Sequence, residues 1–474
     1  MTATPMPRSL QDLAEPEPTA GRTDRSRTPT RRAVLGALGG MAVAAATVAT
    51  PTTAQAAVTR RIAESFWRPA TMGAGTGSGT ALGAAGVRIA QPTGRFDYRD
   101  PHRNAGTVTY ETATWDSPVV TPGFAWTELI ASWNAETPPG TWVQILVRGI
   151  DALGTATAWL VLGRWAAADV SGGAAITRAS LDGQRTAGAA VSTDTLVTGA
   201  AAAYRSWQLR VVLLRAAGTT ATPVVRLAGA VATAVPASGS TAEATSRFGG
   251  TVTTLAVPTY SQEVHSGHYT AWGGGGEAWC SATTTAMILD YWGAGPTPAE
   301  KAWVSPATDA QVDVAARMVY DAEYGGTGNW PFNTAYAGTR ATAGVPLEGF
   351  VTRLADLAAA ESYLSAGVPL GVSLSFSADQ LTGAGYGTGG HLMVLVGFDG
   401  AGNPVVNDPA SHLIADNARV RMTYQRGQFE RAWAESGRTA YVIRPSTTTA
   451  APPTPSGARV PISPGSRSVP RRRG

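Results

Sequence analysis

The hydrophobic pattern of this chain changes once, near residue 236, and this change limits the architectures open to it. Before that point, apolar and polar residues alternate in short runs separated by Pro, Gly and Asp, as in half-buried strands. The runs cover residues 107–113, 124–133, 141–148, 157–165, 206–214 and 223–232. After it, some apolar residues recur at helical spacing and others at the spacing of strands. We therefore predict a β-sandwich domain over 58–235, a linker over 236–250 and an α+β domain over 251–445.

Composition narrows the class of protein further. The chain has 474 residues, of which 44% are hydrophobic and 15% charged, so most of it is expected to fold. Residues 1–57 carry a net charge of +2 and residues 446–474 one of +5, which leaves about −3 for the rest. A basic nucleic-acid-binding face is therefore disfavoured, and no nucleic-acid partner is expected. The Pro- and Arg-rich segment 446–474 is expected to be a disordered tail.

The N-terminal segment is typical of an export signal. Thr30-Arg31-Arg32 precedes an apolar run over 33–48, and Ala54-Gln55-Ala56 offers a cleavage site. The paired arginines indicate a signal of the twin-arginine type over residues 1–57. A membrane anchor is the alternative, but the run is shorter than the roughly 20 residues that a span needs. We expect a secreted, extracellular protein with no stable membrane span.

Cys280 is the single cysteine, which excludes an intrachain disulfide and a cysteine-based zinc site. It follows a glycine run over 273–276 and precedes a segment, 281–292, whose apolar stripe recurs at helical spacing. Gly293 ends the segment. Cys280 is therefore expected at a helix N-terminus, where free N–H groups and the helix dipole stabilise a thiolate. The alternative is a small buried hydrophobic residue.

A candidate base for this thiol is His391, which opens the apolar run 392–398. A capped surface histidine is the alternative. The turn 399–403 follows, and the chain returns to Asn407 and Asp408, so a hairpin is expected. Asp408 or Asn407 could accept a hydrogen bond from one ring nitrogen and turn the imidazole toward Cys280. Symmetric pairing leaves Asp408 roughly 10 Å along the strand from His391, so a bulge or a reach around the turn is required.

Aromatic residues and two further histidines are the remaining candidates for a functional site. Eight of the fourteen tryptophans lie in the strand-rich half, where we expect them in the core rather than on a glycan-binding or cell-wall-binding face. Trp279 and Trp330 are candidates for shaping a cleft, with Asn407. His265 and His268 have the spacing of two metal ligands, but no third ligand is evident, so we expect no metal site and no cofactor. The pair would instead rim the cleft.

Several short segments, in this order, resemble those of papain-fold cysteine peptidases. The closer likeness is to the bacteriocin-processing (double-glycine leader) peptidases and their secreted actinobacterial relatives, over about residues 250–445. The segments that carry it are Val257-Pro-Thr-Tyr-Ser-Gln262, Trp279-Cys-Ser-Ala-Thr283, Gly328-Asn-Trp-Pro-Phe-Asn333, Gly390-His-Leu-Met-Val394, Asn407-Asp-Pro-Ala410 and residues 424–443. Ala282 departs from the family, which usually has proline two positions after the cysteine.

The resemblance implies a role for four residues. Cys280 would be the nucleophile, His391 the general base and then acid, and Asp408 the residue that orients the histidine. Gln262 would join the Cys280 N–H in an oxyanion hole, because tetrahedral intermediates need donors fixed before charge develops. The expected protein is a multidomain chain: an N-terminal all-β sandwich, then an α+β papain-like cysteine peptidase domain that hydrolyses peptide bonds through a thioester. A cell-wall amidohydrolase with the same triad and a catalytically idle glycan- or peptide-binding protein remain as alternatives.

Overall fold

The computed structural model describes residues 60–448 except 170, 187, 200–203 and 235–245. The predicted export signal over 1–57 lies outside the described residues. So do most of the predicted linker and nearly all of the predicted tail. The domain boundaries themselves stay predictions. Within the described part of the chain, no helix is long and apolar enough to cross a membrane.

The N-terminal region is built from strands, as the alternating runs predict. All six predicted runs overlap strands, but the pattern does not predict β1 to β5, which precede the first run, or β10 to β12, which lie between two runs. Among the described residues they form two antiparallel sheets with the orders β10-β11-β12-β7-β14-β4-β3, with β1 also on β14, and β2-β6-β13-β8-β9, with β5 also on β6. The strands are β1 (Arg61–Trp67), β2 (Thr76–Ser78), β3 (Thr80–Gly83), β4 (Gly86–Ile89), β5 (Gly94–Tyr98), β6 (Val108–Asp116), β7 (Glu128–Glu136), β8 (Thr141–Ile150), β9 (Leu160–Trp165), β10 (Arg185–Thr186), β11 (Ala189–Ser192), β12 (Thr195–Thr198), β13 (Ser206–Ala216) and β14 (Val224–Ala234), and a short 3-10 turn, η3, covers Met72–Ala74.

Tryptophan side chains fill the space between the two sheets. Trp67 of β1 meets Trp207 of β13 with ring centroids 6.0 Å apart, and Trp133 of β7 meets Trp165 of β9 at 6.3 Å. Seven of the eight tryptophans of this region are buried, which confirms their prediction as core residues. Trp159 is the exception, because it lies half-buried against the guanidinium groups of Arg148 and Arg210.

The C-terminal region is a mixed α/β structure around a third antiparallel sheet. Its described strand order is β16-β17-β22-β18-β19-β20-β21, with β15 also on β19. The strands are β15 (Thr253–Thr254), β16 (Ala341–Thr342), β17 (Val345–Arg353), β18 (Leu370–Phe376), β19 (Thr388–Phe398), β20 (Pro404–Asn407), β21 (Arg421–Thr423) and β22 (Thr439–Pro445). The helices are α2 (Cys280–Tyr291), α3 (Pro298–Lys301), α4 (Ala310–Val319), α5 (Trp330–Ala337), α6 (Leu357–Ser365) and α7 (Arg426–Glu435), with the 3-10 turns η4 (Gln262–His265), η5 (Gly276–Ala278), η6 (Ser411–Leu413) and η7 (Asn417–Arg419).

Helix α2 differs from its prediction in how much of it is buried. We expected one apolar stripe, but every residue from 281 to 289 is buried, including three consecutive threonines. The helix packs against α4, α5, β18 and β19, so neighbours cover all of its sides. Its start at Cys280 and its end before Gly293, whose φ is +64°, agree with the sequence analysis. Cys280 is thus anchored on a rigid, enclosed element.

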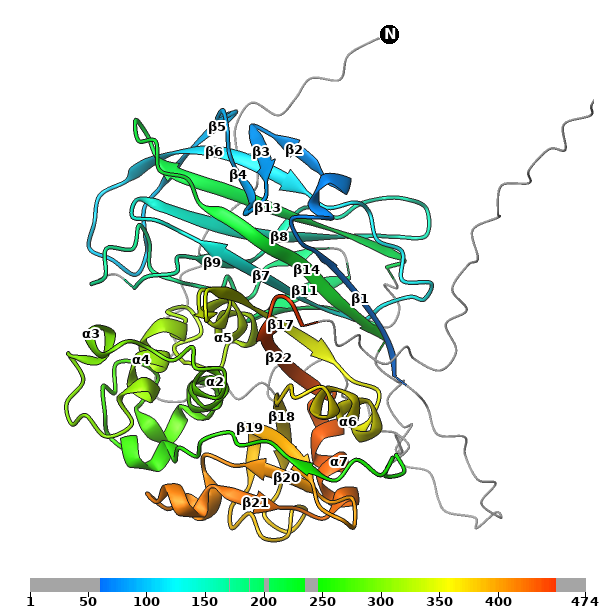
Figure 1. Cartoon of the computed structure of the whole chain (residues 1–474). Coiled ribbons are helices and arrows are strands. Elements are labelled where there is room, and N and C mark those ends of the chain that lie inside the picture. The colour runs from blue at the N-terminus through cyan, green and yellow to red at the C-terminus, as the bar shows by residue number, and fades with distance from the viewer. Residues whose placement is uncertain (1–59, 170, 187, 200–203, 235–245, 449–474) are drawn as a thin grey trace, which may run out of the picture.

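The two regions share one hydrophobic core, as the close approach of α5, β17 and β22 to the upper sheets in Figure 1 indicates. Phe332 of α5 lies with its ring centroid 6.0 Å from Trp133 and 5.4 Å from Trp165. Hydrogen bonds also cross between the two regions. The Asn134 side chain donates through Nδ2 to the Gly349 carbonyl (2.8 Å), and the Gly349 N–H donates to Asn134 Oδ1 (3.1 Å). The interface is therefore packed and hydrogen-bonded like the interior of a single domain.

Candidate active site

The loop before α2 brings Cys280 into position. Gly273, Gly274 and Gly275 have φ values of +80°, +104° and +114°, a region that side chains disfavour, so the glycine run is needed for this path. Gly276 lies directly against the backbone of η4, and a Cβ there would collide with Gln262 and His265. The two short turns η4 and η5 therefore pack backbone to backbone, and Cys280, half-buried, begins α2 immediately afterwards.

His391 reaches Cys280 from the sheet. It pairs with Leu374 of β18 within β19 and is buried. Its Nε2 lies 2.9 Å from Asp408 Oδ1, and its ring is close enough to the Cys280 sulfur for each group to shift the pKa of the other. Because Nε2 is engaged by Asp408, Nδ1 is the nitrogen left for the sulfur. The backbone N–H groups of Leu392 and Ser281 also help to lower the pKa of the Cys280 thiol. The structure thus brings Cys280, His391 and Asp408 together, with His391 between the other two.

A bulge in the hairpin shortens by one residue the gap that symmetric pairing would leave. β19 and β20 pair as Phe398 with Pro404, but the register shifts by one residue between Leu395 and Gly397. As a result Val394 lies opposite Asn407, and Asp408 begins the connection beyond the strand. The extra residue advances Asp408 toward His391, as the sequence analysis required of any triad built on this hairpin.

Asp408 is held by groups that the sequence analysis missed. Its carboxylate is fully buried and accepts from the hydroxyls of Tyr386 (3.0 and 2.9 Å) and Tyr424 (2.7 Å) and from the Ala410 N–H (3.1 Å). Burial, and then the charge of Asp408, raise the pKa of both tyrosines, so both hydroxyls stay protonated and act as donors. Tyr386 lies in the glycine-rich run before His391, whereas Tyr424 had no local signal.

Cys280 and His391 favour the charged forms of each other. Burial would raise the pKa of the Cys280 thiol, but the charge and hydrogen bond of His391 outweigh it and lower that pKa. Burial would lower the pKa of His391, but the negative charges of Cys280 and Asp408 raise it to about 10. The two shifts together favour a thiolate next to an imidazolium.

Gln262 lies beside the loop that leads to Cys280. Its side chain is buried, and Nε2 donates to the carbonyl of Glu277, three residues before the cysteine (2.8 Å). Its own N–H donates to the Pro409 carbonyl (2.9 Å), which ties η4 to the residue after Asp408. An amide nitrogen carries two N–H groups, and the Gln262 side chain also lies close enough to Glu263 to stabilise that carboxylate.

Three predicted cleft residues lie elsewhere. Asn407 is fully buried and donates to the Pro258 carbonyl (2.8 Å), while Arg421 donates to its Oδ1, so it neither lines a cleft nor contacts His391. Trp279 is also fully buried, with Nε1 bonded to the Trp272 carbonyl (2.7 Å), because it caps α2 from inside the core. These two predictions are wrong: the side chains satisfy their polar atoms within the protein interior.

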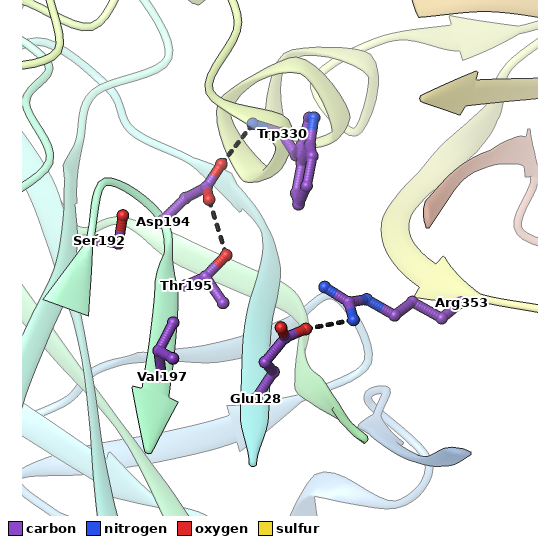
Figure 2. A pocket seen from close by; sticks show the side chains of 7 residues that line it. All are labelled: Glu128, Ser192, Asp194, Thr195, Val197, Trp330 and Arg353. Atoms are coloured by element: carbon purple, nitrogen blue, oxygen red, sulfur yellow. Dashed lines mark hydrogen bonds and ion pairs between the residues drawn. The ribbon is translucent and has the colours of Figure 1, made fainter. Parts of the chain in front are cut away.

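Trp330 lines a cavity, but one between the two regions. Figure 2 shows this cavity, in which the Trp330 N–H donates to Asp194 Oδ2 (2.8 Å) and Arg353 pairs with Glu128. Its lining comes from both regions: Glu128, Ser192, Asp194, Thr195, Val197, Trp330 and Arg353. Neither Cys280 nor His391 lines it, so Trp330 belongs to the interface rather than to the candidate triad.

Two family models match the chain, one for each region. Residues 63–233 match the model described as the Peptidase C39 N-terminal domain, and residues 254–441 match that of the Peptidase_C39 like family. The chain belongs to the C39-type peptidases, in their actinobacterial branch. Neither the curated proteins nor the solved structures contain a significant match to this C39-type chain. Membership supports a cysteine peptidase-type function and agrees with the family that the sequence resembles.

Proposed function

We propose that this C39-type chain is a papain-like cysteine peptidase that hydrolyses peptide bonds with Cys280, His391 and Asp408. The observation that carries the proposal is the continuous contact from the Cys280 sulfur through the His391 ring to the Asp408 carboxylate. The helix-borne cysteine and hairpin-borne histidine support the papain-like comparison.

The reaction follows from the charge state of the pair. The Cys280 thiolate attacks the substrate carbonyl carbon, and the carbonyl oxygen becomes an oxyanion. The protonated His391 then gives its proton to the leaving amine as the peptide bond breaks and a thioester forms. Neutral His391 next takes a proton from water, which attacks the thioester and releases the acid. Asp408 holds the ring in place and stabilises its positive charge.

Gln262 is proposed as one donor of the oxyanion hole. The N–H of Cys280 has no acceptor within α2, because it belongs to the first helical residue. The second N–H of Gln262 would be its partner once it turns from Glu263 to the substrate. Removing such a donor costs roughly 2.7–4 kcal/mol of transition-state stabilisation. The bond from Gln262 Nε2 to the Glu277 carbonyl, in the loop that leads to the cysteine, supports this role because it holds the amide before any charge develops.

The test compares wild type with Cys280→Ser, His391→Ala and Gln262→Ala on unfolded protein and on peptidoglycan. We expect cleavage of unfolded protein that Cys280→Ser and His391→Ala abolish and Gln262→Ala slows. His102→Ala, on a histidine of the N-terminal region, is the matched control and should leave turnover unchanged. Unchanged turnover in Cys280→Ser would end the proposal. Cysteine-dependent release of peptidoglycan fragments alone would instead indicate a cell-wall amidohydrolase, and no adduct with a thiol-directed peptide electrophile would indicate an idle binding protein.

We also propose that the chain is exported through a twin-arginine signal before it acts. The support is the order of Arg31-Arg32, the apolar run and Ala54-Gln55-Ala56 in the sequence. The mass of the protein collected from the medium should then correspond to a mature chain that starts near Ala57. Retention of full-length protein in cells, with no difference for an Arg31→Lys, Arg32→Lys variant, would contradict export by this route.

A further inference from the structure

A second cluster of reactive side chains lies beside the candidate triad without belonging to it. His265 is the last residue of η4, and the N–H of His268 donates to its carbonyl (2.9 Å), which turns both rings to the same side. The ring centroids are 5.3 Å apart and nearly perpendicular. Asp313, in the first turn of α4, extends its carboxylate to both rings. The structure thus supplies the third ligand that the sequence lacked, from 45 residues farther along the chain than His268.

Only half of this cluster is hydrogen-bonded. His268 Nδ1 lies 2.9 Å from Asp313 Oδ1 in hydrogen-bond geometry. His265 Nδ1 is equally close to Asp313 Oδ2, at 2.9 Å, yet neither atom has a hydrogen-bond partner, and His265 Nε2 has none either. Both His265 and Asp313 are 0% exposed. A buried polar atom left unsatisfied costs about 1–3 kcal/mol, so adjacent unpaired nitrogen and oxygen atoms call for a ligand.

We propose that His265, His268 and Asp313 bind a Zn²⁺ ion. The three ligand atoms lie within 4.8 Å of one another, and two imidazoles with one carboxylate suit zinc. Zinc–ligand bonds of about 2.0–2.2 Å in a tetrahedron separate ligand atoms by about 3.4 Å. The 2.9 Å contact between the ligating oxygen of Asp313 and its imidazole would therefore open by about half an ångström. The His268 side chain is 13% exposed, which gives the ion an entry path and a water a place as fourth ligand.

The position of the cluster assigns this ion a structural role. It joins η4, which carries Gln262, to α4. The ring of His265 also lies 6.3 Å from that of Trp279, the residue that precedes Cys280. A metal here therefore fixes two sides of the proposed oxyanion hole while touching neither the nucleophile nor the substrate. His265, His268 and Asp313 are positioning residues.

The experiment counts metal on the full-length protein. Chelator-treated protein is dialysed against Zn²⁺, and bound zinc is measured by mass spectrometry; Co²⁺ loading provides a visible absorption spectrum that reports tetrahedral nitrogen and oxygen ligands. We expect one ion per chain and a higher thermal midpoint with zinc than without it. His268→Ala and Asp313→Asn should lose the ion and the zinc-dependent shift. Cys280→Ser and the control His102→Ala should retain both.

The outcomes separate this proposal from the proposed function, because metal content is measured without substrate. Less than one tenth of an ion per wild-type chain, or no change in midpoint with zinc, overturns the zinc site. If zinc is lost in Cys280→Ser but retained in Asp313→Asn, the metal binds at the triad, and the proposed site at His265, His268 and Asp313 is also overturned. His268 is partly exposed and Asp313→Asn is nearly isosteric, so these variants decide the result if His265→Ala does not fold.

Discussion

At the scale of single residues, the Asp408 carboxylate shows how the site is held together. It accepts hydrogen bonds from two tyrosine hydroxyls, a backbone N–H and His391, and no part of it reaches solvent. A buried carboxylate is tolerated only when it is paired and hydrogen-bonded in this way. The tyrosines therefore stabilise the charge that in turn holds the imidazolium.

Removing one of these hydroxyls should weaken the fold and the site together. Tyr386→Phe and Tyr424→Phe each delete one hydrogen bond to a buried charge, so each should lower the free energy of unfolding by about 1.5–3 kcal/mol. Urea denaturation measures this loss. Tyr291→Phe is a matched control, because its hydroxyl bonds only a neutral carbonyl, that of Gly367 (2.9 Å), and should cost about 0.5–1.5 kcal/mol. Equal costs for all three variants would contradict the role given to Asp408.

The pH dependence of alkylation tests the thiolate directly, since Cys280 is the only thiol. An ordinary thiol, with a pKa of about 8.5, reacts about tenfold more slowly for each pH unit below that value. The pKa of Cys280 is lowered, so its alkylation by iodoacetamide should stay fast well below pH 8. In His391→Ala the compensating charge is gone and burial dominates, so the inflection should move above the ordinary value. The measurement is the adduct mass against time and pH, and an ordinary inflection in wild type would contradict the ion pair.

At the scale of elements, the contact between η4 and η5 depends on Gly276. A methyl group there would collide with the backbone of both Gln262 and His265, so the two turns must separate in Gly276→Ala. We expect a loss of about 1–3 kcal/mol in the free energy of unfolding and slower turnover, because Gln262 moves away from Cys280. Gly400→Ala, in the distant turn between β19 and β20, has open space around it and is the control. Unchanged turnover in Gly276→Ala would separate Gln262 from catalysis.

Local sequence was sufficient to predict the elements that carry Cys280 and His391 but not everything that surrounds them. A glycine run followed by apolar residues at helical spacing predicts Cys280 at a helix start. An apolar run followed by a turn predicts His391 at the start of a hairpin strand. The partners Tyr424 and Asp313 come from other elements and leave no local pattern. Asn407 was misjudged because a polar residue at a strand end satisfies its amide equally well inside the protein, here at Pro258. A triad on this hairpin needed either a bulge or a reach around the turn, and a period-two pattern could not show which of the two occurs or where.

At the scale of the whole molecule, the two regions should unfold together. Phe332 of α5 packs between the rings of Trp133 and Trp165, so the N-terminal sheets complete the core of the C-terminal region. Phe332→Ala should therefore cost about 3–5 kcal/mol. Tryptophan fluorescence and loss of turnover should give coincident transitions in denaturant for wild type. Two separate transitions, with turnover surviving the first, would show that the regions are independent.

The position of β22 has a consequence for how the protein is made. Although β22 comes from residues 439–445, it lies between β17 and β18 in the third sheet. Its Tyr441 hydroxyl bonds Ser281, the neighbour of the nucleophile (2.8 Å). Domains emerge from the ribosome N-terminal part first, so the first two sheets can assemble while the third still lacks a central strand. Synthesis must pass β22 before the sulfur acquires its finished surroundings, so a translation product that stops before residue 439 would lack them.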